Sequence, residues 1–561
     1  MEDVIGQFEF GSATGFTPFG WQLPNLVELP EDPAGISADQ PRRGQVYGAC
    51  SIEAYRAAGA LYGAHRDAGG FLQHVDSYVT PDFWRRDAGV KSWIYDSGAG
   101  EGAAARNMDT VRVFYHAGHG RIDPTGVFHL PMGALWSGTD ASLTSEQMSL
   151  GARNLRYLFW SASDSLCVAD GHSPMRSWAR ANAGLRMMFG FGSSSWDAGD
   201  YGANFWRHWQ MGKPLSQSWL DGATDVSHDQ MPVVSACGAS CDEATETLFG
   251  ERYFRDHRAR GEWWAWRWHE PLKTQQREPV LAAPPAEFQV ARLVPAANDM
   301  ALADSVVAAL DLAPLETVPD GMGRMATTRG NIRLQRRADG RILLELHPGW
   351  PPGSSRSRVP LQRRAIVNRA RSALRRNGFA LQEPDLLFDR IALAKSAAAS
   401  LYMMGEPVPE TLDEIIVQFR QSIGGIPILT PGTGLLRLAM RPDGTVLRIE
   451  AALRRVAELG PACACHYGDP DDVPPPAAGQ VFAAPDFSGI DHVLARRSAR
   501  LMRDLAARGA APLAVSVLPG TTEIGYGIRS NTARLVARQG IEIECARGFR
   551  KRCWIQSDLG D

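Results

Sequence analysis

The chain has 561 residues, of which 44% are hydrophobic and 22% are charged, and its formal net charge is −3. This length exceeds what one compact core holds, so we expect two or three domains, and the composition excludes disordered and fibrous proteins. The near-neutral charge and the lack of a long apolar run predict no nucleic-acid partner and no membrane-spanning segment.

Residues 1–45 are rich in Pro and Gly with scattered aromatic residues, and they are predicted to form an extended N-terminal arm. The first residues lack the basic and apolar regions of a signal peptide. We therefore expect a cytoplasmic protein or, if a signal peptide has been removed, a secreted or periplasmic one.

Two pairs of cysteines are close enough in the sequence to close small loops, Cys237 with Cys241 and Cys545 with Cys553. Disulfides at these positions would indicate an oxidising compartment. Free or buried thiols are the alternative, and the spacing does not decide between the two.

Between residues 46 and 275, apolar strands alternate with helical stretches. Strands are expected at 111–120, 155–163 and 185–195, and helices at 51–69, 173–184 and 202–212. Strands that are apolar throughout and separated by helices indicate an α/β fold, with a mainly parallel sheet covered by helices on both faces. In such sheets the chemistry lies at the carboxyl ends of the strands.

The second half of the chain has a different order of predicted helices and strands. Residues 276–290 are predicted to form a linker, and residues 291–561 an α+β region of antiparallel sheets, each covered by a helix. If this region forms two modules, the break is expected near 460–485.

Two Asp-Gly pairs, Asp339-Gly340 and Asp443-Gly444, lie between strands of alternating polarity. Asp-Gly is a favoured pair for a tight turn between antiparallel strands. Both positions are therefore predicted to be hairpin turns.

The residues suited to chemistry follow two apolar strands. His119 lies in a turn whose glycines let a substrate backbone approach closely, and Ser163 ends the next apolar strand. A histidine and a hydroxyl or thiol group on adjacent strand ends form the base and the nucleophile of acyl transfer. His116 lies close to His119 without a carboxylate partner, so we favour a structural role for it and predict no metal site.

These two strand ends, His119-Gly120 and Ala162-Ser163, resemble the pattern of the caspase-like cysteine peptidases, the group of caspases, legumains, gingipains and separases. The third strand ends in Ser-Ser-Trp, up to Trp196, and a Gly-x-x-Phe helix start follows. The resemblance covers about residues 46–275. It implies a caspase-like catalytic domain with a mainly parallel sheet between helices, and an endopeptidase that works through an acyl-enzyme.

Carried over to this chain, the resemblance implies a role for each matching position. His119 would relay the proton, and residue 163 would attack the carbonyl carbon. The backbone N–H groups of Gly120 and residue 163 would form the oxyanion hole. The implied substrate is a peptide or protein, and no cofactor is implied.

Position 163 departs from the family, because it holds Ser where the family has Cys. An alcohol is much harder to activate than a thiol, whose pKa is about 8.5. The serine fits an inactivating Cys-to-Ser substitution, which we favour, a natural pseudoenzyme that binds without catalysis, or a working serine enzyme. A transamidase or cyclase of the same fold is a further alternative to the peptidase, since an amine can intercept an acyl-enzyme.

The resemblance also implies residues that bind substrate. Ser195 and Trp196 match the substrate-binding stretch, and Asp197 takes the position of the Arg with which caspases bind acidic substrates. A carboxylate there would favour Arg or Lys before the cleaved bond, while a turn or cap role is the alternative. Asp164 could orient His119 or line the pocket, with capping of the strand end as its alternative.

Part of the second half resembles the helix-on-sheet modules of bacterial propeptides, the PepSY and fungalysin-thermolysin propeptide types. The match covers about residues 360–456, with a Gly-Ile-Pro-Ile turn at 425–428 before the Asp-Gly hairpin. Such modules inhibit or chaperone an attached peptidase. The resemblance therefore implies that the C-terminal region regulates or inhibits the first half, and a structural or binding domain is the alternative.

Overall fold

The structure is a computed structural model. It describes residues 46–55, 58–96, 107–133, 142–271, 289–319, 323–346, 362–379, 385–403, 406, 408–461, 490–508 and 512–559. The expected arm at 1–45 and nearly all of the expected linker at 276–290 lie outside the described residues, as does most of the expected break at 460–485.

The first half forms a parallel sheet, as the sequence predicted. In spatial order its parallel strands are β2 (Phe83–Arg86), β1 (Tyr47–Ser51), β3 (Val113–Ala117), β7 (Tyr157–Ser161) and β8 (Met187–Phe191). Two antiparallel strands, β9 (Pro232–Gly238) and β10 (Trp263–Pro271), extend this sheet beyond β8.

Helices cover both faces of these strands. Successive side chains of a strand point to opposite faces, so neighbouring residues pack against different helices. Phe159 of β7 packs against Phe71 and Trp219, and its neighbour Trp160 packs against Trp178 on the other face. The helices of the first half are α1 (Ala64–Asp76), α2 (Pro174–Trp178), α3 (Tyr201–Trp209), α4 (Leu215–Val226) and α5 (Cys241–Gly250). The predicted helix at 51–69 is wrong at its start, since Ser51 ends β1 and α1 begins at Ala64.

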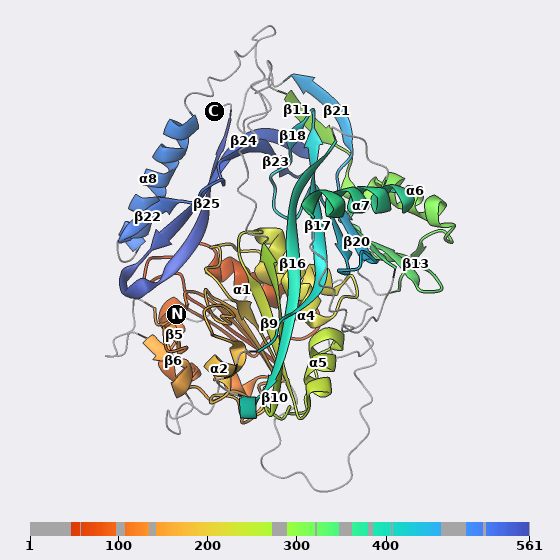
Figure 1. The fold of residues 1–561 in the computed structure, drawn as a ribbon. Helices are drawn as coiled ribbons and strands as arrows, with labels where there is room; N and C mark the ends of the chain where they lie inside the picture. Colours follow the sequence, from red (N-terminus) through yellow and green to blue (C-terminus); the bar gives the residue numbers. More distant parts are fainter. Residues whose placement is uncertain are drawn as a thin grey trace.

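The sheet does not stop at the end of the first half. β10 pairs along its whole length with β16 (Leu386–Ser400), from Trp263 opposite Ser400 to Pro271 opposite Ala392. The antiparallel strands of the second half continue in the order β16, β17, β19, β20, β15, β14, β13, β12, and β18 pairs with β17 at the side. One sixteen-stranded mixed sheet therefore runs through both halves (Figure 1).

These antiparallel strands are covered by two helices. A separate apolar core joins Val306 of α6 (Ala301–Leu310) and Ala370 of α7 (Arg363–Arg376) to residues such as Val417 and Leu436. The strands are β12 (Glu316–Thr317), β13 (Met325–Arg329), β14 (Ile332–Arg336), β15 (Ile342–Glu345), β17 (Thr411–Ile423), β18 (Ile426–Pro427), β19 (Leu435–Met440) and β20 (Val446–Ala452).

Both predicted hairpin turns are confirmed. Gly340 connects β14 to β15 with φ of +83°, and Gly444 connects β19 to β20 with φ of +90°. Only glycine adopts such left-handed backbone conformations without strain.

A second sheet, formed mainly by the end of the chain, lies against the first half. Its strands are β11 (Gln289–Leu293), β21 (Val456–Pro461), β22 (Ala514–Val517), β23 (Glu523–Arg529), β24 (Thr532–Glu544) and β25 (Arg550–Asp558). Helix α8 (Ile490–Arg508) packs on β24 and β25, and Figure 1 shows this layer beside α1. Its buried residues join the apolar core of the first half.

Three short strands form a small separate sheet, β4 (Arg121–Ile122), β5 (Phe128–Pro131) and β6 (Ser142–Thr144). In the described part of the chain, no helix is both long enough and apolar enough to cross a bilayer. Cys237, Cys241, Cys545 and Cys553 are free thiols, so neither predicted small loop is closed by a disulfide.

Candidate active site

Three neighbouring strands of the parallel half end at the same edge of the sheet. β3 leads to His119, β7 to Ser163 and β8 to Ser195. The N–H of Gly118 donates to the carbonyl oxygen of Ser161 over 3.1 Å, which joins the first two strand ends. The N–H of Ser195 donates to Ser163 Oγ over 3.1 Å, which joins the second to the third. The strands thus bring the predicted site residues together.

His119 is held as a neutral ring with one nitrogen available. Its Nε2 donates to the carbonyl oxygen of Gly59 over 2.8 Å, and its backbone N–H donates to the hydroxyl of Tyr55 over 3.0 Å. Nε2 carries the ring hydrogen, so Nδ1 has the lone pair, and no described residue forms a hydrogen bond with it. Burial, helped by the charge of Lys551, lowers the pKa of His119 to about 3.

Gly120 follows His119 where no side chain fits. A Cβ at this position would lie 2.6 Å from the Phe128 ring and 2.9 Å from the carbonyl oxygen of Ser163. Among the described residues, no hydrogen-bond partner is found for the N–H of Gly120 or of Ser163. Two such donors close together can hold an oxyanion.

Ser163 is completely buried. Its Oγ accepts from the N–H of Ser195 and donates to the carbonyl oxygen of Arg550 over 3.2 Å. Within the described residues, no hydrogen bond connects Ser163 to His119. The hydroxyl is therefore occupied by another part of the chain.

Asp164 lies in the left-handed backbone region, with φ of +56°. Burial raises the pKa of its carboxyl to about 6, and the charges of Arg552 and Arg550 act in the opposite direction. Asp164 thus faces the positive end of β25, and none of its hydrogen bonds in the described chain reaches His119.

Asp197 caps the beginning of α1. Its carboxylate accepts from the N–H groups of Tyr62 and Gly63 over 2.8 and 2.9 Å. Burial raises the pKa of Asp197, and the nearby Lys551 opposes the rise. The structure therefore gives Asp197 the capping contacts that the sequence left open, next to a buried lysine.

The C-terminal strand β25 enters this site. The N–H of Arg552 donates to the carbonyl oxygen of Ser195 over 3.2 Å, and the N–H of Asp197 donates to the carbonyl oxygen of Arg552 over 2.7 Å. Beside this pairing, Trp554 stacks on Trp196 with ring centroids 4.2 Å apart. The stretch predicted to bind substrate thus binds a strand of its own chain.

The side chain of Lys551, on β25, enters the site. Its Nζ donates to Ser195 Oγ over 2.8 Å and to the carbonyl oxygen of Gly118 over 3.3 Å. Burial lowers the pKa of Lys551, and the carboxyl groups of Asp197 and Asp67 oppose the fall. A lysine side chain therefore fills the space between the strand ends.

Asp67 of α1 is the second buried acid near Lys551. Its carboxyl accepts from the hydroxyl of Tyr115 over 2.9 Å and from the N–H of Gly202 over 2.8 Å. Burial raises its pKa to about 7. Sequence reasoning missed both residues. The signal for Lys551 is its place among the inward positions of β25, shared with Cys553 and Ile555, while Arg550 and Arg552 are more exposed.

The described residues bring together one group with the geometry of a metal site, away from the strand ends. It consists of His208, Asp221 and Glu450, but Lys213 Nζ lies 2.6 to 2.8 Å from all three and fills the position of an ion. His116 is buried and bonds to the hydroxyl of Tyr95 over 2.8 Å. These contacts fit a structural role for His116.

Residues 49–268 match the model of a protein family described as a domain of unknown function (DUF6345). The matched stretch contains every predicted site residue and ends within β10, so it does not include β25. No curated protein and no solved structure matches the chain.

Proposed function

We propose that residues 46–275 form a caspase-like cysteine-peptidase scaffold, in which His119 is the base and position 163 the nucleophile. The observation that carries this proposal is the meeting of the ends of β3, β7 and β8, with a neutral histidine, a small nucleophilic side chain and two backbone donors. In this chain the nucleophile is Ser163, the less reactive group for such a site.

The proposed reaction follows from the geometry of the available groups. Nδ1 of His119 takes the proton of the nucleophile at 163, which attacks the carbonyl carbon of the peptide bond. The N–H groups of Gly120 and residue 163 receive the oxyanion, and His119 then protonates the leaving amine. Water releases the acyl group in a second step of the same kind. An amine in place of water would give the transamidase alternative.

A preference for a basic side chain is supported by Lys551. A lysine occupies the site, and the carboxyl groups of Asp67, Asp197 and Asp164 act electrostatically on its ammonium group. A substrate residue of the same chemistry would meet the same charges if β25 moved away.

The proposed inhibitory role of the C-terminal region rests on the same contacts. β25 bonds to the backbone of Ser195 and Asp197, and it occupies the hydroxyl of Ser163. β25 lies after the propeptide-like stretch at 360–456 in the sequence and belongs to the second sheet. The second sheet would therefore supply the strand that inhibits the site.

The test places a thiol at position 163 and weakens the contact of β25 with the site, in the full chain. We expect Ser163→Cys with Lys551→Met to be labelled at residue 163 by an acyloxymethyl ketone and to cleave Lys- or Arg-containing fluorogenic peptides. Ser163→Cys alone should react more slowly, and His119→Asn in the double variant should abolish turnover. Equal cleavage after acidic and basic residues would remove the basic preference.

The second candidate is a pseudoenzyme that binds without catalysis. It is favoured by Ser163 itself and by the use of its hydroxyl to hold β25. A folded double variant that is neither labelled nor active would sink the peptidase proposal and leave this candidate.

A further inference from the structure

A cavity of about 540 Å³ lies where three distant parts of the chain meet. It is lined by the loop after α4, by β16 and β17, and by β23 to β25. This volume is in the range of small-molecule sites in proteins, about 300–1,000 Å³. Neither His119 nor Ser163 lines the cavity, while Arg552 and Trp554 of β25 line it from the side of the candidate active site.

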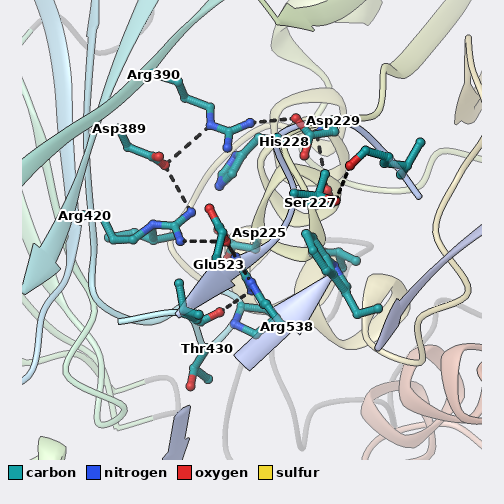
Figure 2. A pocket seen from close by; sticks show the side chains of 18 of the residues that line it. Asp225, Ser227, His228, Asp229, Asp389, Arg390, Arg420, Thr430, Glu523 and Arg538 are labelled. Atoms are coloured by element: carbon teal, nitrogen blue, oxygen red, sulfur yellow. Dashed lines mark hydrogen bonds and ion pairs between the residues drawn. The ribbon is translucent and has the colours of Figure 1, made fainter. Parts of the chain in front are cut away.

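Four arginines line this cavity, and three of them converge on it from different strands (Figure 2). The fourth is Arg552 of β25. Arg390 comes from β16, Arg420 from β17 and Arg538 from β24. The side chain of Arg420 is 5% exposed and that of Arg538 is 9% exposed. Burying guanidinium groups is costly unless anionic groups compensate them.

Two of the acidic side chains around the arginines are shared between them, and a third, Asp229, lies 2.9 Å from Arg390 Nη1. Asp389 lies 3.3 Å from Arg420 Nη2 and 3.5 Å from Arg390 Nε. Glu523 lies 2.7 Å from Arg538 Nη2 and 3.5 Å from Arg420 Nη1. Each of these two carboxylates therefore serves two cations.

Arg420 keeps donors that the surrounding chain does not satisfy. Its Nε is buried without a hydrogen bond to any described residue. Its Nη1 and Arg390 Nε also form no hydrogen bond in the described chain, and each has only a carboxylate oxygen at 3.5 Å. Burial, followed by repulsion from Arg538 and Arg390, holds the pKa of Arg420 well below its usual range. Burial and repulsion from Arg390 lower the pKa of Arg538 to about 9. The cavity is also lined by four carboxylates, those of Asp225, Asp229, Asp389 and Glu523. An anion would therefore be held by the unsatisfied guanidinium donors and not by a surplus of positive charge.

Apolar side chains complete the lining, among them Ile428, Leu435 and Trp554. Thr430 also lines the cavity (Figure 2), and its hydroxyl accepts from the N–H of Ile528. A ligand that fits would combine an anionic group for the arginines with a small apolar part.

We propose that this cavity binds a small organic anion, with its carboxylate or phosphate group held by Arg420, Arg390 and Arg538. Guanidinium groups bind both kinds of anion through paired N–H donors, so the two share one chemistry. The site does not depend on any reaction at His119.

The test titrates the full chain with inorganic phosphate and, separately, with succinate, in chloride buffers of matched ionic strength. Calorimetry should show saturable binding of at least one anion, with a rise in melting temperature. Arg420→Met should weaken it roughly tenfold or more. Arg503→Met, which removes an exposed arginine of α8, should leave it unchanged.

Binding of phosphate alone would assign a phosphate ligand, and binding of succinate alone a carboxylate ligand. If Arg420→Met does not fold, Arg390→Met provides the same comparison. The proposal is overturned if neither anion binds saturably, or if a folded Arg420→Met or Arg390→Met binds as the unmodified chain does.

Discussion

At the scale of single residues, Gly120 has no free space for a side chain. Replacing it by Ala places a Cβ against Phe128 and the Ser163 carbonyl at 2.6 and 2.9 Å. We expect Gly120→Ala to lower the free energy of unfolding by about 1–3 kcal/mol, as overpacking does. Gly250→Ala is the control, since a Cβ there meets nothing within 4 Å. Urea unfolding measures the stability of both variants, and equal losses in the free energy of unfolding would show that position 120 is not crowded.

Asp67 should give folding stability a particular pH dependence. Its pKa of about 7 in the folded state exceeds the ordinary value of 3.8, so the folded state binds more protons between these pH values. Its stabilising contribution is therefore present below pH 3.8 and is lost as pH rises towards 7.

Asp67→Asn imitates the protonated carboxyl. We therefore expect the melting temperature of the variant to rise relative to that of the unmodified chain as pH increases from about 4 to 7. Thermal unfolding across this range measures the difference. Asp242→Asn, at an exposed position of α5, is the control. A constant difference at every pH would show that Asp67 is ionised throughout.

At the scale of elements, a buried ion network crosses the join between the two halves. Glu414 of β17 lies 2.8 Å from Arg267 of β10 and 2.8 Å from Arg448 of β20. These two charges outweigh the cost of burial and lower the pKa of Glu414 to about 2.

Glu414→Gln would leave two buried arginines with less compensation. We expect a loss of about 3 kcal/mol in the free energy of unfolding, in the range for a broken buried pair. Glu146→Gln, which removes an exposed partner of Arg180, should cost less than about 1 kcal/mol. Similar losses in the two variants would mean that solvent reaches the network.

The elements around the candidate site were predictable because their signals are local. Apolar strands ending in small residues identified β3, β7 and β8, and Asp-Gly pairs identified two hairpins. The approach of Lys551 to Gly118 spans 433 residues and carries no local signal. The pairing of β10 with β16 escaped prediction for the same reason, since either strand could have formed a sheet edge.

At the scale of the whole molecule, the continuous sheet should make the two halves depend on each other. Residues 46–275 expressed alone would leave β10 as a long apolar edge with unpaired backbone groups, which is a template for association. We expect this fragment to form oligomers or aggregates under conditions in which the full chain stays dispersed. Light scattering measures this, and a monodisperse, folded fragment would contradict the expectation.

The join between β10 and β16 also has a consequence for biosynthesis. β10 ends at Pro271 and β16 begins at Leu386, so the ribosome completes one strand well before it starts its partner. At usual elongation rates of about 5–20 residues per second, this interval is on the order of ten seconds. For that time the nascent chain presents an open strand containing Trp263, Trp264, Trp266 and Trp268. Chaperones that shield apolar segments during translation would act at this stage.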